Sequence, residues 1–354
     1  MSVRSLEFVI PGDLQASTGG YGYDRRMIAG LRTLGWQVTL HMLDASFPQP
    51  THAALEHARE IFTHLPDQAL VLVDGLALGA MPHIVHPHAR RLRLLALIHH
   101  PLAAESGLAP NQVLELAHSE RLALQAMHHV LVTSHATQRA LLSYGVDPAR
   151  VSVVAPGTDA APLAPRRRGS ILNMLCVATL TPRKGHDLLF EALAPLSAHW
   201  QLTCVGSLTR SPATVAALRQ QLLRLRLDRQ VSLAGEVDSV ALAQRYAQAD
   251  LFVLPTRYEG YGMAVAEALA RGLPVISTPV GAIPELVGSQ AGLLVAADDV
   301  RMLRAALERV LTEPDLLDSL ARGAEAVRGT LPGWPQSCAL MSQVLQNAAD
   351  HGGG

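Results

Sequence analysis

Short apolar runs alternate along the chain with segments whose apolar residues recur every three or four positions. In the first half, the short runs cover residues 6–10, 37–43, 69–75, 94–99, 129–134 and 151–157. Between two of them, residues 111–127 have apolar positions at i, i+3 and i+4, a spacing typical of a helix. This alternation of strands and helices predicts a parallel sheet with helices on both faces.

The alternation stops once and then restarts. Residues 161–170, APLAPRRRGS, contain two Pro, three consecutive Arg and a Gly without any periodicity, which is typical of a linker. Strand-like runs then follow at residues 172–180, 201–207, 231–237, 250–256, 273–279 and 292–295. We therefore predict an α/β fold with two domains, residues 1–165 and 166–333, and a terminal helix at residues 334–349.

Composition narrows the function classes. A chain of 354 residues with 49% hydrophobic and 17% charged side chains is too apolar for disorder and long enough for two cores. A net charge of −1 argues against a nucleic-acid partner. No apolar stretch reaches the roughly 18 residues of a membrane span, and the first apolar run is too short for a signal sequence, so we expect a cytoplasmic protein. Three widely spaced Cys fit neither a disulfide framework nor a zinc ribbon.

Two candidate sites follow strands of the first half. After the first strand, Gly19, Gly20 and Gly22 precede a helix that we expect to begin near Tyr23, and they would let backbone N–H groups approach an anion. A plain turn is the alternative. The fourth strand runs into His99 and His100, which places an imidazole at the carboxyl end of the sheet, where ligands bind. With 13 of the 16 His before Ala136, a surface imidazole is the alternative here.

A cationic loop follows the first strand of the second half. Among the 29 basic residues of the chain, Lys184 is the single Lys, and it follows Arg183 and precedes Gly185 and a helix. A compact ammonium, a second cation and a helix N-terminus all favour an anion, so this loop is a candidate diphosphate site. Loop cations that face solvent are the alternative.

The densest signal lies in residues 254–286. Glu259 follows a strand, Gly260, Tyr261 and Gly262 open an Ala-rich helix, and Glu267 falls in the second turn of that helix. Carboxylates can accept hydrogen bonds from the vicinal hydroxyls of a sugar or a ribose, and the amides of residues 260–263 suit an anion. For Glu267 the alternative is a solvated helix face.

In their order and spacing, these segments resemble the family 4 retaining glycosyltransferases. Glu259 to Glu267 is similar to the E-x7-E motif of that family, Gly19 and Gly20 to its N-terminal glycine loop, and PRKGHDLL to its donor-phosphate segment. Residues 129–159 and 272–287 extend the likeness over nearly the whole chain. The resemblance implies the GT-B fold, in which two Rossmann-like domains face each other across a cleft. It also implies that the second domain binds the donor and that the helix at 334–349 packs back on the first domain.

The resemblance also assigns roles to individual residues. Lys184 would meet the diphosphate, Glu267 the ribose and Glu259 the donor sugar, while His99 matches the active-site His, although His100 stays an alternative. The catalytic set is then His99, Lys184 and Glu259. The implied donor-binding residues are Gly19, Gly20, Thr179, Arg183, Lys184, Val237, Glu259, Gly260, Tyr261, Gly262, Met263 and Glu267. The implied acceptor-binding residues are Tyr21, Tyr23, His100 and Glu105.

Two positions depart from the family pattern. The family has an Arg five residues before the Lys, where this chain has Thr179, and whether Arg183 replaces it stays open. The Asn-Gly near the end of the first domain is Pro156-Gly157 here. Both departures concern phosphate binding rather than the family itself.

The resemblance implies retaining sugar transfer from a nucleotide-diphosphate sugar, most commonly a UDP-sugar, with a GDP-sugar as an alternative and without a metal or cofactor. The acceptor, whether a small molecule, a glycan or a lipid, is not determined by the sequence, and neither are peripheral membrane contact and oligomeric state. Two alternatives remain: a nucleotide-sugar-binding protein without turnover, and an epimerase or phosphorylase on the same fold.

Overall fold

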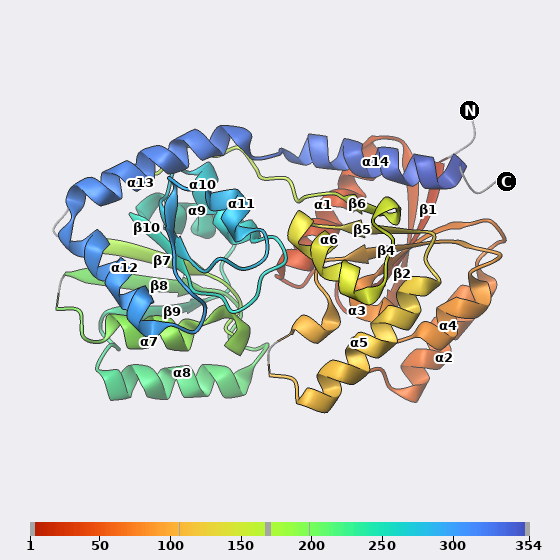
Figure 1. Cartoon of the computed structure of the whole chain (residues 1–354), viewed down its shortest axis with the longest axis horizontal. Coiled ribbons are helices and arrows are strands. Elements are labelled where there is room, and N and C mark those ends of the chain that lie inside the picture. Colours follow the sequence, from red (N-terminus) through yellow and green to blue (C-terminus); the bar gives the residue numbers. More distant parts are fainter. Residues whose placement is uncertain (1–3, 106, 167–170, 198, 351–354) are drawn as a thin grey trace. The chain divides into compact units, whose positions relative to one another are not determined.

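The computed structural model describes residues 4–105, 107–166, 171–197 and 199–350 (Figure 1). The chain divides into two compact units: unit 1 contains residues 1–157 and 332–354, and unit 2 contains residues 158–331. The first division thus follows Gly157 and the second follows Leu331, ahead of the predicted boundaries after residues 165 and 333.

Unit 1 is built on a parallel six-stranded sheet with the order β2-β1-β3-β4-β5-β6. Its strands are β1 (Arg4–Pro11), β2 (Trp36–Leu43), β3 (Leu70–Asp74), β4 (Arg93–Ile98), β5 (His129–Val132) and β6 (Val151–Val153). Its helices are α1 (Gly19–Thr33), α2 (His52–His64), α3 (Gly75–Leu78), α4 (Pro82–Val85), α5 (Pro110–Gln125), α6 (His135–Leu141) and α14 (Trp334–Asp350). The apolar runs therefore mark every one of these strands to within a few residues.

Helices cover both faces of the unit 1 sheet, as a parallel sheet requires. Helices α2, α4 and α5 pack over a core that includes Phe62, Met81 and Leu124, whereas α1 and α14 pack against each other (Figure 1). The indole Nε1 of Trp36 donates a hydrogen bond to Ser342 Oγ of α14 at 2.8 Å. The terminal helix thus belongs to the core of unit 1.

Unit 2 has a second parallel six-stranded sheet, with the order β12-β11-β10-β7-β8-β9. Its strands are β7 (Leu172–Val177), β8 (Trp200–Val205), β9 (Val231–Gly235), β10 (Leu251–Leu254), β11 (Val275–Ser277) and β12 (Gly292–Leu294). Its helices are α7 (His186–Leu193), α8 (Pro212–Leu225), α9 (Ser239–Gln248), α10 (Met263–Ala270), α11 (Ile283–Val287), α12 (Val300–Thr312) and α13 (Pro314–Val327). In unit 2, α7 and α8 lie on one face of the sheet, and α9 and α10 lie on the other (Figure 1). Both units are thus doubly wound, Rossmann-like domains.

The predicted linker is in part a packed segment of unit 2. Arg166 Nη2 pairs with Glu325 Oε1 at 2.5 Å, and the carbonyl of Ala161 accepts a hydrogen bond from the Arg328 guanidinium at 2.6 Å. The amide of Ala164 donates to Arg271 O at 2.8 Å. Pro and Arg without periodicity correctly indicated irregular backbone, but not the contacts that hold it. Residues 167–170 of the predicted linker lie outside the described residues.

Among the residues that the structure describes, no helix has the length and apolar character needed to cross a membrane.

Candidate functional site

The strand order of unit 2 reverses between β7 and β10, and ligands of open parallel sheets bind outside the carboxyl ends of the strands at such a switch point. The loop after β7 carries Lys184, and the loop after β10 carries Glu259. Although 75 positions separate them in sequence, the Lys184 Nζ donates to Glu259 Oε2 at 2.5 Å. Their side chains are only 13% and 14% exposed, so little water screens this ion pair.

Hydrogen bonds fasten the two loops to each other. The carbonyl oxygen of Arg183 accepts from the Thr256 Oγ1 at 3.1 Å and from the amide of Arg257 at 2.7 Å. Gly185 has φ +70°, and a Cβ there would lie 2.1 Å from the carbonyl oxygen of Pro255, so only Gly lets the loops approach this closely. The position of Lys184 beside Glu259 is therefore built into the backbone.

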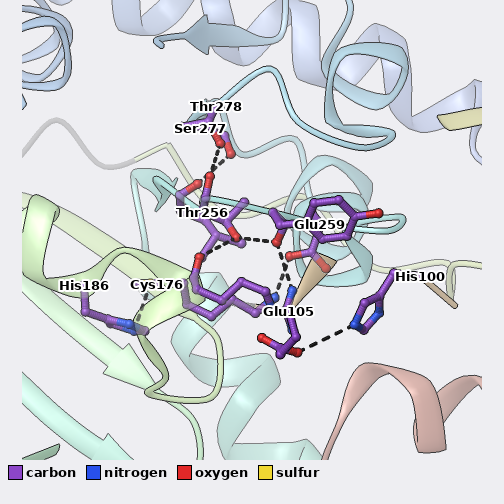
Figure 2. Close-up of polar contacts among 12 residues, drawn as sticks. His100, Glu105, Cys176, His186, Thr256, Glu259, Ser277 and Thr278 are labelled. Carbon is purple, nitrogen blue, oxygen red and sulfur yellow. Dashed lines mark hydrogen bonds and ion pairs between the residues drawn. The ribbon is translucent and has the colours of Figure 1, made fainter. Parts of the chain in front are cut away.

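The loop after β10 is also fixed from the side of β11. Figure 2 shows the hydroxyls of Ser277 and Thr278 directed at this segment. Ser277 Oγ donates to Leu254 O at 2.6 Å and Thr278 Oγ1 donates to Thr256 O at 2.5 Å, and both side chains are buried. These hydrogen bonds hold the carboxyl end of β10 in place, just ahead of the loop that carries Glu259.

The guanidinium groups near Lys184 have partners within unit 2. Arg183 Nη1 donates to Tyr258 O at 2.9 Å, so this side chain already spans the two loops. At the position of the missing family Arg, Thr179 is half-buried and its carbonyl accepts from the amide of Thr181 at 2.8 Å. Whether Arg183 also meets a phosphate therefore stays a proposal.

Arg257 is a cation that the sequence reading did not single out. Its guanidinium pairs with Asp187 Oδ2 and with Asp298 Oδ1, each at 2.7 Å, and it also donates to the carbonyl of Pro182. Hydrogen bonds from its guanidinium to Asp187 and Asp298 hold the pKa of Arg257 above its ordinary value. Arg257 thus joins the loop that carries Lys184 to the loop that carries Glu259.

Glu267 lies on α10, behind the loop that holds Glu259. Residues 260–262 are buried and Met263 begins α10, which puts Glu267 in its second turn. Glu267 Oε2 accepts a hydrogen bond from the Tyr246 hydroxyl at 3.0 Å. Burial raises the pKa of Glu267, although the bond from Tyr246 opposes this. The alternative of a solvated helix face is therefore wrong. The predicted base contact, Val237, is half-buried and follows β9.

The strand order of unit 1 reverses between β1 and β3, and the predicted glycine loop follows β1. Helix α1 begins at Gly19 rather than near Tyr23, because the Thr18 side chain caps it by accepting from the amide of Tyr21. Gly19 is exposed, and a Cβ on Gly20 would lie 3.4 Å from the His99 ring. The glycines thus form the first turn of α1, beside His99.

His99, at the end of β4, faces two buried carboxylates. Its Nε2 lies 3.3 Å from Asp24 Oδ1 and 3.5 Å from Asp74 Oδ2, and its side chain is 21% exposed. Burial alone lowers the pKa of His99, but the adjacent negative charges of Asp24 and Asp74 outweigh it and raise that pKa to about 10. Burial also raises the pKa of Asp24 to about 6. The two carboxylates thus favour the protonated form of His99.

The residues predicted to bind the acceptor differ in their exposure to solvent. His100 Nε2 lies 3.6 Å from Glu105 Oε2, and both side chains are partly exposed (Figure 2). Tyr21 and Tyr23 are buried instead, and their hydroxyls donate to Pro11 O at 2.6 Å and to Val154 O at 3.0 Å. The two tyrosines are core residues of unit 1, and the predicted acceptor contact is corrected accordingly.

Two groups of side chains among the described residues could hold a metal ion: Asp24 with Asp74 and His99, and Cys176 with His186 and Cys204. In the second group, Cys176 Sγ lies 3.6 Å from His186 Nε2 (Figure 2). Hydrogen bonding to Cys204 lowers the pKa of the Cys176 thiol, and the same bond raises that of Cys204. All three cysteines of the chain are free and buried.

The sequence analysis did not identify four residues of these sites: Asp24, Asp74, Tyr246 and Arg257. Helical spacing offered a signal for Asp24, because it shares the apolar face of α1 with Met27, Ile28 and Leu31. Asp74 ends a fully buried strand at its carboxyl end, where ligands bind. Tyr246 and Arg257 offered no comparable signal, since an aromatic on a helix and an Arg in a loop are both common.

Profiles of known protein families match the sequences of both units. The profile described as Glycosyltransferase Family 4 matches residues 25–161, and the one described as Glycosyl transferases group 1 matches residues 172–313. The D-inositol 3-phosphate glycosyltransferase of Thermomonospora curvata is 27% identical over 289 residues, which are 75% of this chain and 67% of that protein. Its counterpart in Kineococcus radiotolerans is 30% identical over 262 residues, 65% of this chain and 59% of the relative. The chain thus matches little more than half to two thirds of these relatives.

Solved structures share the fold over nearly the whole chain. Sucrose-phosphate synthase from Thermosynechococcus elongatus superposes with a TM-score of 0.81 at 21% identity, covering 97% of this chain and 98% of that one. HepE from Anabaena, solved in complex with UDP and glucose, gives a TM-score of 0.75 at 18% identity, covering 96% and 99%. At this identity the structures establish a common fold.

Proposed function

We propose that this chain, which belongs to glycosyltransferase family 4 and has the GT-B fold, transfers a sugar from a nucleoside diphosphate sugar to an acceptor hydroxyl. The observation that carries the proposal is the ion pair of Lys184 and Glu259 at the β7/β10 switch point. It brings together the cation needed for a diphosphate and the carboxylate needed for sugar hydroxyls.

The ion pair also suggests how the donor enters the site. A diphosphate carries more negative charge than one carboxylate, so it competes for the Lys184 ammonium. Once Lys184 turns to the phosphate, Glu259 Oε2 is released to accept hydrogen bonds from the donor sugar. Because the backbone of both loops is fastened, this exchange of partners needs side-chain motion alone.

The reaction breaks the bond between the anomeric carbon and the diphosphate oxygen and forms a bond to the acceptor oxygen. We propose that the new bond forms on the face that the leaving group departs from, so that the anomeric configuration is retained. The acceptor proton passes to the departing phosphate. Lys184 and the amides at the start of α10 stabilise the negative charge that develops there, so we propose that no metal ion is required.

A UDP-sugar is the donor that we favour. The fold neighbour HepE was solved with UDP and glucose, and this is the support for the base and for a hexose. We assign Glu267, held by the Tyr246 hydroxyl, to the ribose hydroxyls and Val237 to the surroundings of the base. A GDP-sugar remains the alternative.

We assign the acceptor to unit 1, where His99, His100 and Glu105 lie at or beyond the carboxyl end of β4. The relatives include D-inositol 3-phosphate glycosyltransferases and an MMP α-(1→4)-mannosyltransferase from Mycolicibacterium hassiacum. Their names point to different acceptors, so we propose only the shared chemistry: an acceptor with a free hydroxyl, on a small molecule, a glycan or a lipid.

A donor screen tests the proposal. Purified protein is mixed with UDP- and GDP-linked sugars, and thermal stabilisation and release of nucleoside diphosphate are measured with and without a crude cell extract as the acceptor source. We expect one donor to stabilise the protein and the extract to accelerate release, with the same rate in the presence of EDTA.

Other outcomes would separate the alternatives. Stabilisation without release, with any acceptor source, would favour a nucleotide-sugar-binding protein without turnover. A change in the configuration of the sugar on the nucleotide, without transfer, would favour an epimerase. An absence of any response to the donors would contradict the proposed donor class.

A further inference from the structure

Unit 1 buries two carboxylates around a single imidazole. The side chains of Asp24 and Asp74 are 0% and 4% exposed, and both face the Nε2 of His99, at 3.3 and 3.5 Å. They come from different elements: Asp24 from α1, Asp74 from the end of β3 and His99 from the end of β4. The fold thus gathers a group of three titratable side chains at the carboxyl end of the sheet.

The hydrogen bonds around this group leave His99 as the partner of both acids. Asp74 Oδ1 accepts from the amide of Leu76 at 2.7 Å, which leaves Oδ2 for His99. Neither oxygen of Asp24 has a well-aligned hydrogen bond from the described residues, and the same holds for His99 Nε2. A buried carboxylate without a donor is costly, so it needs a nearby positive charge.

The other groups packed around His99 do not supply that charge. The Arg25 guanidinium donates to the carbonyls of Leu14 and Ala16, so its charge only assists Asp24 from a distance. The ring of Tyr23 meets His99 edge to face with 5.3 Å between centroids, and its hydroxyl is bonded elsewhere. The charge that offsets the two carboxylates must therefore reside on the imidazole.

We propose that Asp24 and Asp74 are positioning residues that hold His99 as an imidazolium, with Nε2–H directed at the carboxylates and Nδ1–H left for a substrate oxygen. A Cβ on Gly20 would lie 3.4 Å from the Cδ2 of the ring, so glycine at this position lets α1 come close to His99. The backbone of His99 is held by hydrogen bonds from the Thr133 and Thr137 hydroxyls to its carbonyl oxygen, at 3.2 and 3.4 Å. The substrate role rests on the proposed sugar transfer, whereas the protonation state does not.

The proposal predicts an unusual His. Two carboxylates and one imidazolium leave a net charge of −1, and the next proton adds to Asp24, whose pKa is about 6. His99 keeps its charge until the pH approaches 10, whereas an ordinary His loses it near 6.5. His99 would therefore act as a hydrogen-bond donor and not as a base, which agrees with the phosphate taking the acceptor proton.

The first test measures protonation directly and needs no enzymatic activity. Imidazole nitrogens of the full chain, labelled at histidine, are followed by NMR from about pH 6 to pH 9, and His99 is assigned from the spectrum of His99→Gln. We expect the His99 signals to remain those of an imidazolium throughout this range. A neutral His99 in the middle of this range overturns the proposal.

The second test uses kinetics on Asp24→Asn and Asp74→Asn. We expect kcat to fall about tenfold to a hundredfold with little change in donor KM, and the rate to acquire an inflection near neutral pH as His99 titrates. The matched control is Glu7→Gln, which removes the acid of the Glu7–His41 pair, 2.7 Å apart in the same unit, and should leave the rate unchanged.

Two checks keep the outcomes distinct. Asn at position 74 can still accept from the amide of Leu76, so Asp74→Asn decides the question if Asp24→Asn fails to fold. A pH profile of the Asn variants that matches the wild type overturns the positioning role. Stoichiometric Mn²⁺ that broadens the His99 signals overturns it as well, in favour of a metal site. If the wild type transfers no sugar, the proposed function fails, while the NMR result still tests the imidazolium.

Discussion

The two units differ in how they neutralise acidic side chains near the carboxyl ends of their strands. In unit 2 each of two such carboxylates pairs with its own Lys or Arg, whereas in unit 1 buried carboxylates share one His or have no cationic partner among the described residues. In unit 2, Glu259 pairs with Lys184 at 2.5 Å and Asp187 with Arg257 at 2.7 Å. In unit 1, Asp24 shares His99 with a second acid, and Glu120 of α5 has no cation among the causes of its pKa shift. Two sheets of the same type thus carry opposite arrangements of charge.

The difference has a physical consequence for each unit. Paired charges in unit 2 can exchange partners with an anionic ligand without a change of protonation. The acids of unit 1 instead respond to pH, since burial raises the pKa of Asp24 to about 6 and that of Glu120 to about 8. We therefore expect mutations in unit 2 to act mainly on donor use and mutations of the buried acids in unit 1 to act mainly on pH dependence.

The largest effect is expected from Lys184→Ala, which breaks the pairing in unit 2. Loss of the ammonium removes charge stabilisation from the leaving diphosphate, so kcat/KM for the donor should fall about 100- to 1000-fold, and the melting temperature should fall as well because Glu259 loses its buried partner. Release of nucleoside diphosphate and thermal unfolding are measured together. The control is Arg309→Ala, which removes an exposed cation that pairs with Glu313 on the surface of unit 2. Full activity in the Lys184 variant would contradict the assignment of the diphosphate site.

The second effect concerns a buried acid of unit 1. Glu120 Oε2 accepts from the amide of Leu102 at 3.0 Å, and burial raises the pKa of the carboxyl from 4.5 to about 8. The folded state thus binds this proton more tightly than the unfolded state, so stability falls as the pH rises from about 4.5 through about 8. Glu120→Gln should remove this dependence and raise the free energy of unfolding by about 2 kcal/mol above pH 8.

Urea unfolding on both sides of the transition checks this expectation. Gln can still accept the hydrogen bond from Leu102, so the variant should fold normally under acidic conditions. Glu115→Gln is the matched control, because Glu115 is an exposed residue of the same helix. Equal pH dependence of the wild type and the Glu120 variant would refute the assignment of this proton to Glu120.

The third effect tests the cation that joins the two loops of unit 2. Arg257→Gln removes the ion pairs with Asp187 and Asp298 and should lower the free energy of unfolding by about 1 kcal/mol, since both acids are largely exposed. Donor KM should also rise, because the Lys184 loop loses a tether. Arg59→Gln, which breaks an exposed pair with Glu56 in unit 1, is the comparison variant. A donor KM that responds equally to both variants would show that the tether has no special role.

The sequence predicted the sheets well for a simple reason. Strands of parallel sheets are buried on both faces, so they form nearly continuous apolar runs such as β3 and β4, which periodicity detects. The pairing of Lys184 with Glu259 could not be predicted from the periodicity of apolar residues. It depends on β7 lying beside β10 although β8 and β9 come between them in sequence, and strand order leaves no mark on local pattern.

The residues that the sequence reading misassigned in unit 1 have a common cause. The three glycines suggested a loop, and Tyr21 and Tyr23 were interpreted as loop residues facing an acceptor. Capping by Thr18 begins the helix before them and turns both rings into the core. The same helix carries Asp24 inward, where a buried acid depends on a partner from another strand, and such a partner is set by tertiary structure.

The smallest effect is expected from removing one tyrosine hydroxyl, and the same change can be made in each unit. Tyr246→Phe removes the hydroxyl that donates to Glu267 Oε2, while the ring keeps its stacking on Phe252 and its contact with the Arg271 guanidinium. Without that donor, burial raises the pKa of Glu267 further, so its carboxylate form is disfavoured as the pH falls. Donor KM should rise about two- to fivefold, mostly below neutral pH, with kcat nearly unchanged.

Tyr21→Phe is the matched change in unit 1, where the hydroxyl donates to Pro11 O at 2.6 Å. Because this hydroxyl is buried and bonded to backbone, its loss should cost some stability and leave both donor and acceptor KM unchanged. Steady-state kinetics with each substrate varied in turn separate the two cases. A rise in acceptor KM for Tyr21→Phe would restore the acceptor contact that burial argues against. An unchanged donor KM for Tyr246→Phe would mean that Glu267 binds the ribose, if at all, without help from its neighbour.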